Sequence, residues 1–301
     1  MIKTNYHQPV LLRPSVTALI TDPNGIYVDA TFGGGGHSRQ ILQQLGPEGC
    51  LFAFDQDADA VSNVPQDDRF TFVEANFRDI ERYLKLYGVT TIHGVLADFG
   101  VSSHQFDAKE RGFSIRFDGP LDMRMDQTAR KSATDIVNGY SLEELTQLFK
   151  LYGEVKGAYR VAEQIVATRQ HQKIETTFAL IEAVRSLIPE RFLNKTLAQI
   201  FQAIRIEVND ELSVIKDLLL ASARVLASEG RLVCISYHSL EDRLVKHFIR
   251  EGVFEGVAPQ DFYGNRHLPF KKRGGMVAPD AEEIEKNKRA RSAKMRIAEK
   301  R

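Results

Sequence analysis

A run of glycines preceded by an acid is the sharpest chemical signal in the sequence. It reads Asp29-Ala-Thr-Phe-Gly-Gly-Gly-Gly-His37 and ends the apolar segment 26–32, which predicts a buried strand. Glycines between a strand and a helix let a ligand approach the backbone closely. The spacing is neither the GxGxxG of a dinucleotide site nor a phosphate-binding loop with its lysine. An acid four residues ahead of the glycines is instead typical of S-adenosylmethionine (SAM) sites. The alternative is a flexible turn that only joins strand to helix.

Further acidic and polar residues follow the next predicted strands. Asp55 ends the segment 50–55, 19 residues after Gly36, close to where a carboxylate accepts both hydroxyl protons of a ribose. Asp57 competes for this role, and an exposed acid after a strand is the alternative.

The segment after the predicted strand 92–99 is also polar. It carries Asp98, Ser102, Ser103 and Gln105. Residues just past the carboxyl end of a strand face the ligand in open α/β sheets. Neither a G-x-S-x-G elbow nor a cysteine nucleophile is present here, so nucleophilic hydrolysis lacks its usual parts. The alternative is a capped turn before a helix.

The elements that must position these residues alternate between strand and helix in both outer parts of the chain. Short apolar runs separated by helix-length segments predict βαβ units and a parallel sheet. These runs lie at 26–32, 50–55, 70–74, 92–99 and 231–238. We expect a helix at 210–227, another capped by Ser239-Leu-Glu-Asp242, a loop over 252–280 and a last edge strand at 293–298.

The middle of the chain has a different pattern. From Ser132 to about Ile200 it is wholly helical, with a capping box at Ser141-Leu-Glu-Glu144. Before it, Phe113 and Phe117 alternate with arginines, so this stretch could stack bases and hold phosphates. The arginines are Arg111, Arg116 and Arg124. The alternative is a salt-bridged loop, because Asp118, Asp122 and Asp126 lie close by.

Composition limits the class of protein. The 301 residues carry 40 basic and 40 acidic side chains and are 43% hydrophobic, as in ordinary globular proteins. Cys50 and Cys234 lie far apart, which excludes a disulfide framework or a CxxC zinc site and suggests buried thiols in a reducing compartment. Residues 1–7 lack the apolar stretch of a signal peptide, and no segment is long and apolar enough for a membrane span. We expect a soluble, cytoplasmic protein.

Two further charged segments have alternative interpretations. Residues 286–301 hold eight basic side chains and one acid, which suits either a phosphate contact or a solvated terminal charge run. Lys271-Lys-Arg273 predicts a mobile basic loop. His238 with Glu241 and Asp242 could be half of a metal site, but a helix cap is the better interpretation, and we predict no metal.

Eight separate segments of the chain resemble the bacterial RsmH (MraW) family. They occur in family order and span nearly the whole chain. They are residues 7–12, 29–38, 98–105, 111–114, 118–126, 201–209, 238–243 and 290–296. The sequence departs from the family at Gly34, where many relatives carry a larger residue, at Tyr237, where Phe is usual, and at Lys288, often Pro.

The resemblance implies a class I SAM-dependent methyltransferase acting on N4 of one cytidine in the decoding region of 16S rRNA, within the small ribosomal subunit. Its fold would be a Rossmann-like, doubly wound α/β sheet with an inserted all-helical domain. We therefore expect a methyltransferase domain of residues 1–106 and 203–301 and a substrate-recognition insertion of residues 107–202. Whether the protein is a monomer or a homodimer stays open.

The resemblance also implies roles for particular residues. Gly35, Gly36 and His37 would contact SAM, Asp55 its ribose, and Phe77 the adenine side. Asp98 and Gln105 would complete the pocket.

Methylation of a cytosine amine needs a group that accepts an N4–H bond, because the nitrogen lone pair is delocalised into the ring. Asp98 is our candidate; a nearby backbone carbonyl, assisted by Ser102 or Ser103, is the alternative. Other functions that the sequence leaves open are SAM-dependent methylation of DNA or a small molecule and a non-catalytic role in ribosome assembly. An NAD-dependent oxidoreductase is disfavoured by the missing third glycine.

Overall fold

A computed structural model describes residues 9–301, so the amino-terminal segment 1–7 and the start of the first family motif lie outside the described residues. The chain divides into two compact units, one formed by the residues up to Gly100 together with Leu212–Arg301, the other by Val101–Glu211. These limits lie six and nine residues from those expected at 106 and 202, and the second differs because helix α9 (Leu193–Asn209) continues through residue 202.

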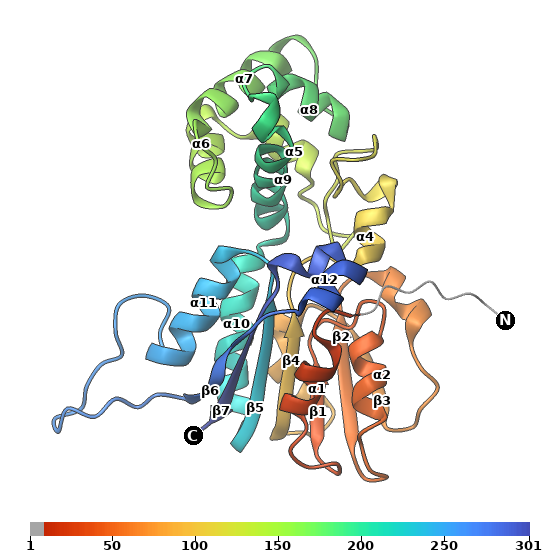
Figure 1. The fold of residues 1–301 in the computed structure, drawn as a ribbon, viewed down its shortest axis with the longest axis vertical. Helices are drawn as coiled ribbons and strands as arrows, with labels where there is room; N and C mark the ends of the chain where they lie inside the picture. The colour runs from red at the N-terminus through yellow and green to blue at the C-terminus, as the bar shows by residue number, and fades with distance from the viewer. Residues whose placement is uncertain (1–8) are drawn as a thin grey trace. The chain divides into compact units, whose positions relative to one another are not determined.

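The first unit is built on a sheet that has, within residues 9–301, seven strands in the order β3-β2-β1-β4-β5-β7-β6 (Figure 1). Strands β1 to β5 are mutually parallel, and β7 is antiparallel to both of its neighbours. The strands are β1 Ile26–Asp29, β2 Cys50–Asp55, β3 Phe70–Glu74, β4 Ile92–Asp98, β5 Leu226–Ser236, β6 Phe270–Val277 and β7 Lys294–Lys300. The predicted parallel sheet is therefore confirmed, although the first strand ends at Asp29 rather than at Phe32.

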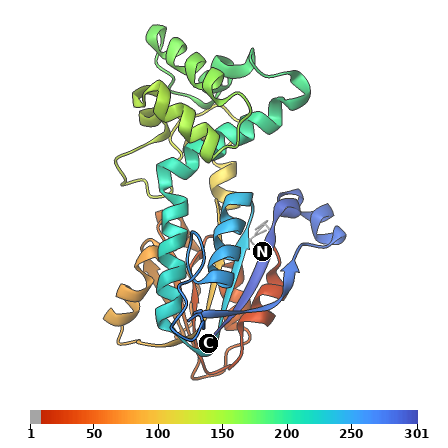
Figure 2. The ribbon, with the colours of Figure 1, turned by 90° about the vertical axis from the view of Figure 1, so that its left-hand side faces the viewer.

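Helices cover both faces of this sheet because successive strand residues point to opposite sides. Tyr27 packs with one layer of helices, whereas its neighbour Val28 packs with the other. Helices α3, α10 and α11 lie on the Val28 face (Figure 2). Helices α1 and α2 lie on the Tyr27 face. The helices of this unit are α1 Leu12–Leu19, α2 Gly36–Leu42, α3 Ile80–Leu86, α10 Glu211–Val225, α11 Ser239–Glu251 and α12 Ala281–Lys286. This is the doubly wound, Rossmann-like arrangement that the sequence predicted.

Three predictions for the last third of the chain are wrong. The expected loop 252–280 contains strand β6, whose glycines and lysines resemble a loop in sequence but lie on a sheet edge, where few side chains need burial. Strand β7 is consequently internal rather than the edge, and its Met295 and Ala298 are buried. Helix α11 has His238 as its N-cap, one residue earlier than expected.

The second unit is helical from Ser132 onward, as predicted. Its core gathers apolar side chains from five helices around Phe149 and Phe201. The predicted capping box of Ser141 and Glu144 is present, and Ser132 with Asp135 forms another. The helices are α4 Ser103–Asp107, α5 Ala133–Gly139, α6 Leu142–Leu151, α7 Ala158–His171, α8 Thr177–Arg185 and α9 Leu193–Asn209. Among the residues that the structure describes, no helix is long and apolar enough to cross a membrane.

Candidate cofactor site

The glycine loop follows β1 at the carboxyl edge of the parallel strands. Gly33 and Gly35 have φ angles of +50° and +71°, in the left-handed region that glycine tolerates best. A Cβ atom on Gly35 would lie 2.9 Å from the Phe32 ring, and one on Gly36 would lie 2.1 Å from Pro9 Cγ. Side chains are therefore excluded, and the loop presents its backbone.

Asp29 anchors this loop from beneath. Its carboxylate accepts hydrogen bonds from Ser38 Oγ at 2.7 Å and from the Thr31 backbone N–H at 3.1 Å. Burial raises the pKa of Asp29 to about 6, although both hydrogen bonds act in the opposite direction. Asp29 therefore ties β1 to helix α2 and fixes the path of the glycines.

Asp55 lies at the end of β2, beside the loop. Its Oδ2 accepts the Gly33 N–H at 2.7 Å and its Oδ1 the Asp57 N–H at 2.9 Å. Each carboxylate oxygen has two lone pairs, so each retains capacity for one hydroxyl of a diol. Burial raises the pKa of Asp55 to about 6. Asp57 is instead the N-cap of the short helix η1 (Ala58–Asn63), which favours Asp55 as the ribose ligand.

Asp98 ends β4, two strands away from β2 in the sheet. Its Oδ1 accepts a hydrogen bond from the Tyr237 hydroxyl at 2.8 Å, and its backbone N–H donates to Thr31 Oγ1 at 2.7 Å. Burial raises the pKa of Asp98 to about 8, while the Tyr237 hydrogen bond lowers it. Neither Tyr237 nor Thr31 is among the site residues predicted from the sequence. The signal for Tyr237 is the register, because Asp98 pairs with Ile235, two residues before the tyrosine.

His37 is buried between Val10 and Asp98. Its Nε2 lies 3.2 Å from the Val10 carbonyl oxygen, while Nδ1 lies 3.9 Å from Asp98 Oδ2, too far for a hydrogen bond. Burial lowers the pKa of His37 to about 4, so the ring is neutral at pH 7. The side chain packs inside the unit, so the backbone of His37 is the part available to a ligand.

Phe77 begins the short helix η2 (Phe77–Asp79), directly after β3. Its half-buried ring lies 6.2 Å from that of Phe99, centroid to centroid. Asn76 before it donates to Gln56 Oε1 at 2.7 Å, which ties η2 to the residue following Asp55. An apolar ring thus follows the end of β3, the strand next to β2 and its Asp55. An adenine attached to a ribose at Asp55 would need such a ring.

Three polar residues of the predicted site belong to the second unit. Ser102 is the N-cap of α4; its Oγ accepts the Gln105 N–H at 3.2 Å, and the Gln105 side chain accepts the Ser102 N–H at 2.9 Å. Ser103 is the first residue of this helix. The capped turn that we considered as an alternative is thus present, and it engages both Ser102 and Gln105.

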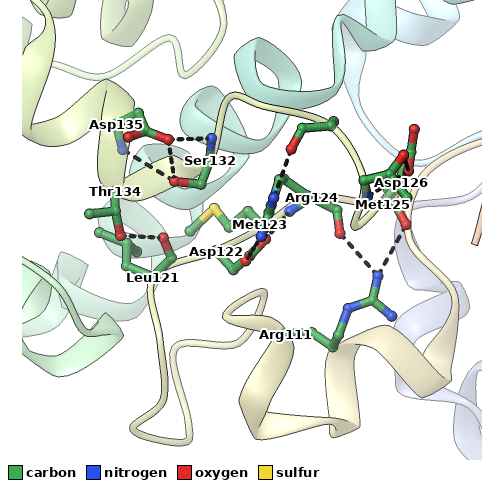
Figure 3. A network of polar contacts seen from close by, with 12 residues as sticks. Arg111, Leu121, Asp122, Met123, Arg124, Met125, Asp126, Ser132, Thr134 and Asp135 are labelled. Atoms are coloured by element: carbon green, nitrogen blue, oxygen red, sulfur yellow. Dashed lines mark hydrogen bonds and ion pairs between the residues drawn. The ribbon is translucent and has the colours of Figure 1, made fainter.

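The arginine-rich loop of the second unit is held by its own side chains (Figure 3). Arg111 is buried and donates to the carbonyl oxygens of Arg124 and Met125 at 3.0 and 3.1 Å. Arg124 forms two hydrogen bonds to Asp122, at 2.9 and 2.6 Å. Phe113 is buried in the helical core. These three residues therefore stabilise the loop, as expected for the alternative of a salt-bridged loop.

The other two aromatic and basic residues of this loop face solvent. The Phe117 side chain is 43% exposed, and Arg116 is exposed. Arg124 is half-buried, so these two are the most exposed of the five.

The basic carboxyl-terminal segment is partly neutralised. Arg296 forms an ion pair with Asp242 at 2.6 Å, and Lys286 pairs with Glu282 at 2.5 Å. Glu241 is fully buried and its Oε2 accepts the backbone N–H of Tyr237 at 2.8 Å. His238, Glu241 and Asp242 therefore cap and brace helix α11.

The sheet order, the antiparallel β7, the glycine loop after β1 and the acid after β2 together define a SAM-dependent methyltransferase with a Rossmann-like fold. The chain matches the model of the MraW methylase family over residues 4–301, and it belongs to that family. Both the resemblance and the predicted cofactor are thereby confirmed.

Sequence identity to the relatives is high, whereas identity to the solved structure is low. The chain is 56% identical over 295 residues to "Ribosomal RNA small subunit methyltransferase H" of Flavobacterium johnsoniae, covering 98% of each chain. It is 54% identical over 300 residues to the protein of the same name from Christiangramia forsetii, covering 100% of this chain and 99% of the relative. The crystal structure of TrmN from Thermus thermophilus is similar with a TM-score of 0.44 and 11% identity, covering 97% of this chain and 48% of that one.

Proposed function

We propose that this protein transfers a methyl group from SAM to N4 of a single cytidine in the decoding region of 16S rRNA. The observation that carries the proposal is the set of acids and glycines at the carboxyl ends of β1, β2 and β4, in a chain more than half identical to relatives named as small-subunit rRNA methyltransferases. The substrate would be the small ribosomal subunit, which places the reaction in the cytoplasm.

The residues at the sheet edge fit SAM. The backbone of Gly35, Gly36 and His37 would border the amino acid part, Asp55 would accept the ribose hydroxyls, and Phe77 would pack on the adenine. Asp98 and Gln105 complete the set by family resemblance. When bound, SAM supplies a methyl group activated by its attachment to a positively charged sulfur. Positioning then supplies much of the catalysis, on the order of 7–11 kcal/mol for well-oriented reactants.

Asp98 is our candidate for the group that receives the N4–H bond of the cytosine. A carboxylate accepts such a bond, which helps to localise the nitrogen lone pair. The Tyr237 hydroxyl at 2.8 Å holds the Asp98 carboxyl in one orientation. The alternative acceptor is a backbone carbonyl assisted by Ser102 or Ser103, and Ser102 is already engaged as a helix cap.

The second unit would recognise the RNA. We assign direct contact to Arg116 and Phe117, whose side chains are exposed. Arg111, Phe113 and Arg124 would act by shaping the loop that presents them. A target base in structured RNA must also be unstacked, at a cost of a few kcal/mol.

The decisive experiment is mass spectrometry of nucleosides from small subunits lacking this methylation, incubated with the protein and SAM. We expect one N4-methylated cytidine per 16S rRNA. Methylation of DNA but not of subunits would favour another substrate, and absence of SAM binding would favour a non-catalytic assembly factor.

A matched pair of variants then tests the role of Asp98. We expect Asp98→Asn to bind SAM with turnover lost, while Asp242→Asn, which changes an acid braced against Arg296, retains turnover. Loss of SAM binding in Asp98→Asn would assign Asp98 to cofactor binding alone.

A further inference from the structure

Two neighbouring aromatic side chains of the first unit are almost fully exposed. Phe262 is 97% exposed and Tyr263 is 84% exposed. They lie in the segment between α11 and β6, which runs outward from the sheet (Figure 1). Their rings are 5.5 Å apart and perpendicular, with an interplanar angle of 89°. Exposed aromatic groups of this kind mark interaction sites, because leaving them in water forgoes the benefit of burial.

The turn that carries these rings is built by one acid. Asp261 Oδ1 accepts the backbone N–H of Tyr263 at 2.9 Å and that of Asn265 at 2.8 Å. The Asp261 carbonyl oxygen accepts the N–H of Gly264, whose φ of +83° closes the turn. These hydrogen bonds lower the pKa of Asp261. The two rings are therefore presented by a hydrogen-bonded turn, which reduces the entropy lost when a ligand binds.

Cationic side chains follow the turn in the chain. Lys271 and Lys272 on the edge strand β6 are exposed, and neither forms an ion pair among the described residues. Seven residues lie between Tyr263 and Lys271, so the Cα atoms of these two residues are at most about 29 Å apart. Arg273 beside them shares Glu299 with Arg231, so that single acid is already neutralised. Exposed aromatic rings and exposed lysines thus occur within ten positions of one another in the chain.

We propose that Phe262, Tyr263, Lys271 and Lys272 form an auxiliary binding surface for single-stranded RNA. Bases stack on exposed aromatic rings, and lysines that follow them closely in the chain can neutralise the phosphates that connect the bases. A duplex keeps its bases stacked on one another, so the surface selects unpaired nucleotides. The inference rests on the proposed function only in that the substrate is RNA; it adds a contact within the first unit, apart from the cofactor site.

The test compares the full chain with the double variant Phe262→Ala/Tyr263→Ala. The probes are a labelled single-stranded oligouridylate and an RNA duplex of equal length, titrated by fluorescence anisotropy. We expect the double variant to bind the single strand about tenfold to a hundredfold more weakly, with duplex binding unchanged. Lys271→Gln/Lys272→Gln should reduce the slope of log affinity against log salt by about 1.4. Leu86→Ala, which removes another exposed apolar side chain, is the matched control and should have no effect.

Two results would overturn the inference. One is equal binding of the single strand by the wild-type protein and the double variant. The other is a change of sedimentation from dimer to monomer in the double variant, which would make this surface a contact between copies of the chain. Methylation of small subunits separates this failure from failure of the proposed function. If the wild-type protein methylates and the double variant does so with unchanged KM, only the auxiliary surface is refuted; we expect a raised KM with unchanged kcat.

Discussion

Replacing Asp98 by Asn should remove a pH dependence from both stability and cofactor binding. Burial raises the pKa of Asp98 from 3.8 to about 8, so the folded protein keeps this carboxyl protonated at neutral pH. The unfolded chain has released that proton above about pH 4. The folded state therefore binds more protons than the unfolded state between pH 4 and 8, and stability falls as the pH rises through this window.

The magnitude follows from the size of the shift. Each pH unit within the window costs about 1.4 kcal/mol, so the loss by pH 8 reaches about 5 kcal/mol as an upper bound. Asparagine resembles the protonated acid and can still accept the Tyr237 hydrogen bond. Asp98→Asn should therefore match the wild-type protein near pH 4 and be more stable at pH 8, by about 2–5 kcal/mol.

The affinity for SAM should rise with pH, whereas the stability of the fold falls. A positively charged ligand beside Asp98 favours the carboxylate, so binding of SAM releases a proton below pH 8. We expect SAM affinity of the wild-type protein to rise by up to about tenfold per pH unit between pH 6 and 8. The demethylated product has a neutral sulfur and should show a smaller slope.

Calorimetry at several pH values, with denaturant unfolding of both proteins, measures these quantities. Asp29 and Asp55 also titrate near pH 6, so the comparison with Asp98→Asn isolates the contribution of Asp98. Equal pH slopes for SAM in the wild-type protein and in Asp98→Asn would refute the reasoning, as would a variant that is less stable at pH 8.

Three further substitutions probe the two units. Gly35→Ala places a side chain at φ +71° and 2.9 Å from the Phe32 ring, so we expect a loss of about 1–3 kcal/mol in unfolding free energy and weaker SAM binding by calorimetry. Asp55→Ala removes the proposed acceptor for the ribose hydroxyls and should weaken SAM binding at least tenfold, with a retained circular dichroism spectrum. Asn209→Ala removes hydrogen bonds of 2.8 Å to both Met123 and Met125 and should lower the unfolding free energy of the second unit by about 1–3 kcal/mol, measured by denaturant titration.

The parallel strands could be predicted from sequence because each is a short apolar run bounded by turn residues. Strand β2 (Cys50–Asp55) and strand β3 (Phe70–Glu74) were predicted with their observed limits. Strand β6 could not, since an edge strand needs little apolar burial and its Lys-Lys-Arg-Gly-Gly sequence has no alternation. Without β6, the position of β7 inside the sheet could not be deduced.

Residues of the candidate site also differ in whether a local sequence signal identifies them. Glycine spacing and strand-end acids are local signals, so Gly35, Asp55 and Asp98 could be selected from the sequence. The Asp98–Tyr237 hydrogen bond joins residues 139 positions apart and depends on the register of β4 with β5. Likewise, Arg111 and Phe113 are buried whereas Arg116 and Phe117 of the same stretch are exposed, and tertiary packing alone decides this difference.

Three buried or half-buried acids at one sheet edge are costly, and burial is the main reason that the pKa of each is raised. Asp29 contributes to the raised pKa of both Asp55 and Asp98. Among the residues that the structure describes, no basic side chain counteracts the raised pKa of these three acids. Buried carboxylates without a cationic partner lower the stability of the folded protein at neutral pH. Packing alone therefore gives no reason to retain three of them here. A ligand that brings its own positive charge would relieve this repulsion on binding, and SAM carries such a charge on its sulfur. The electrostatics of the strand ends therefore favour a cationic cofactor independently of the glycine spacing.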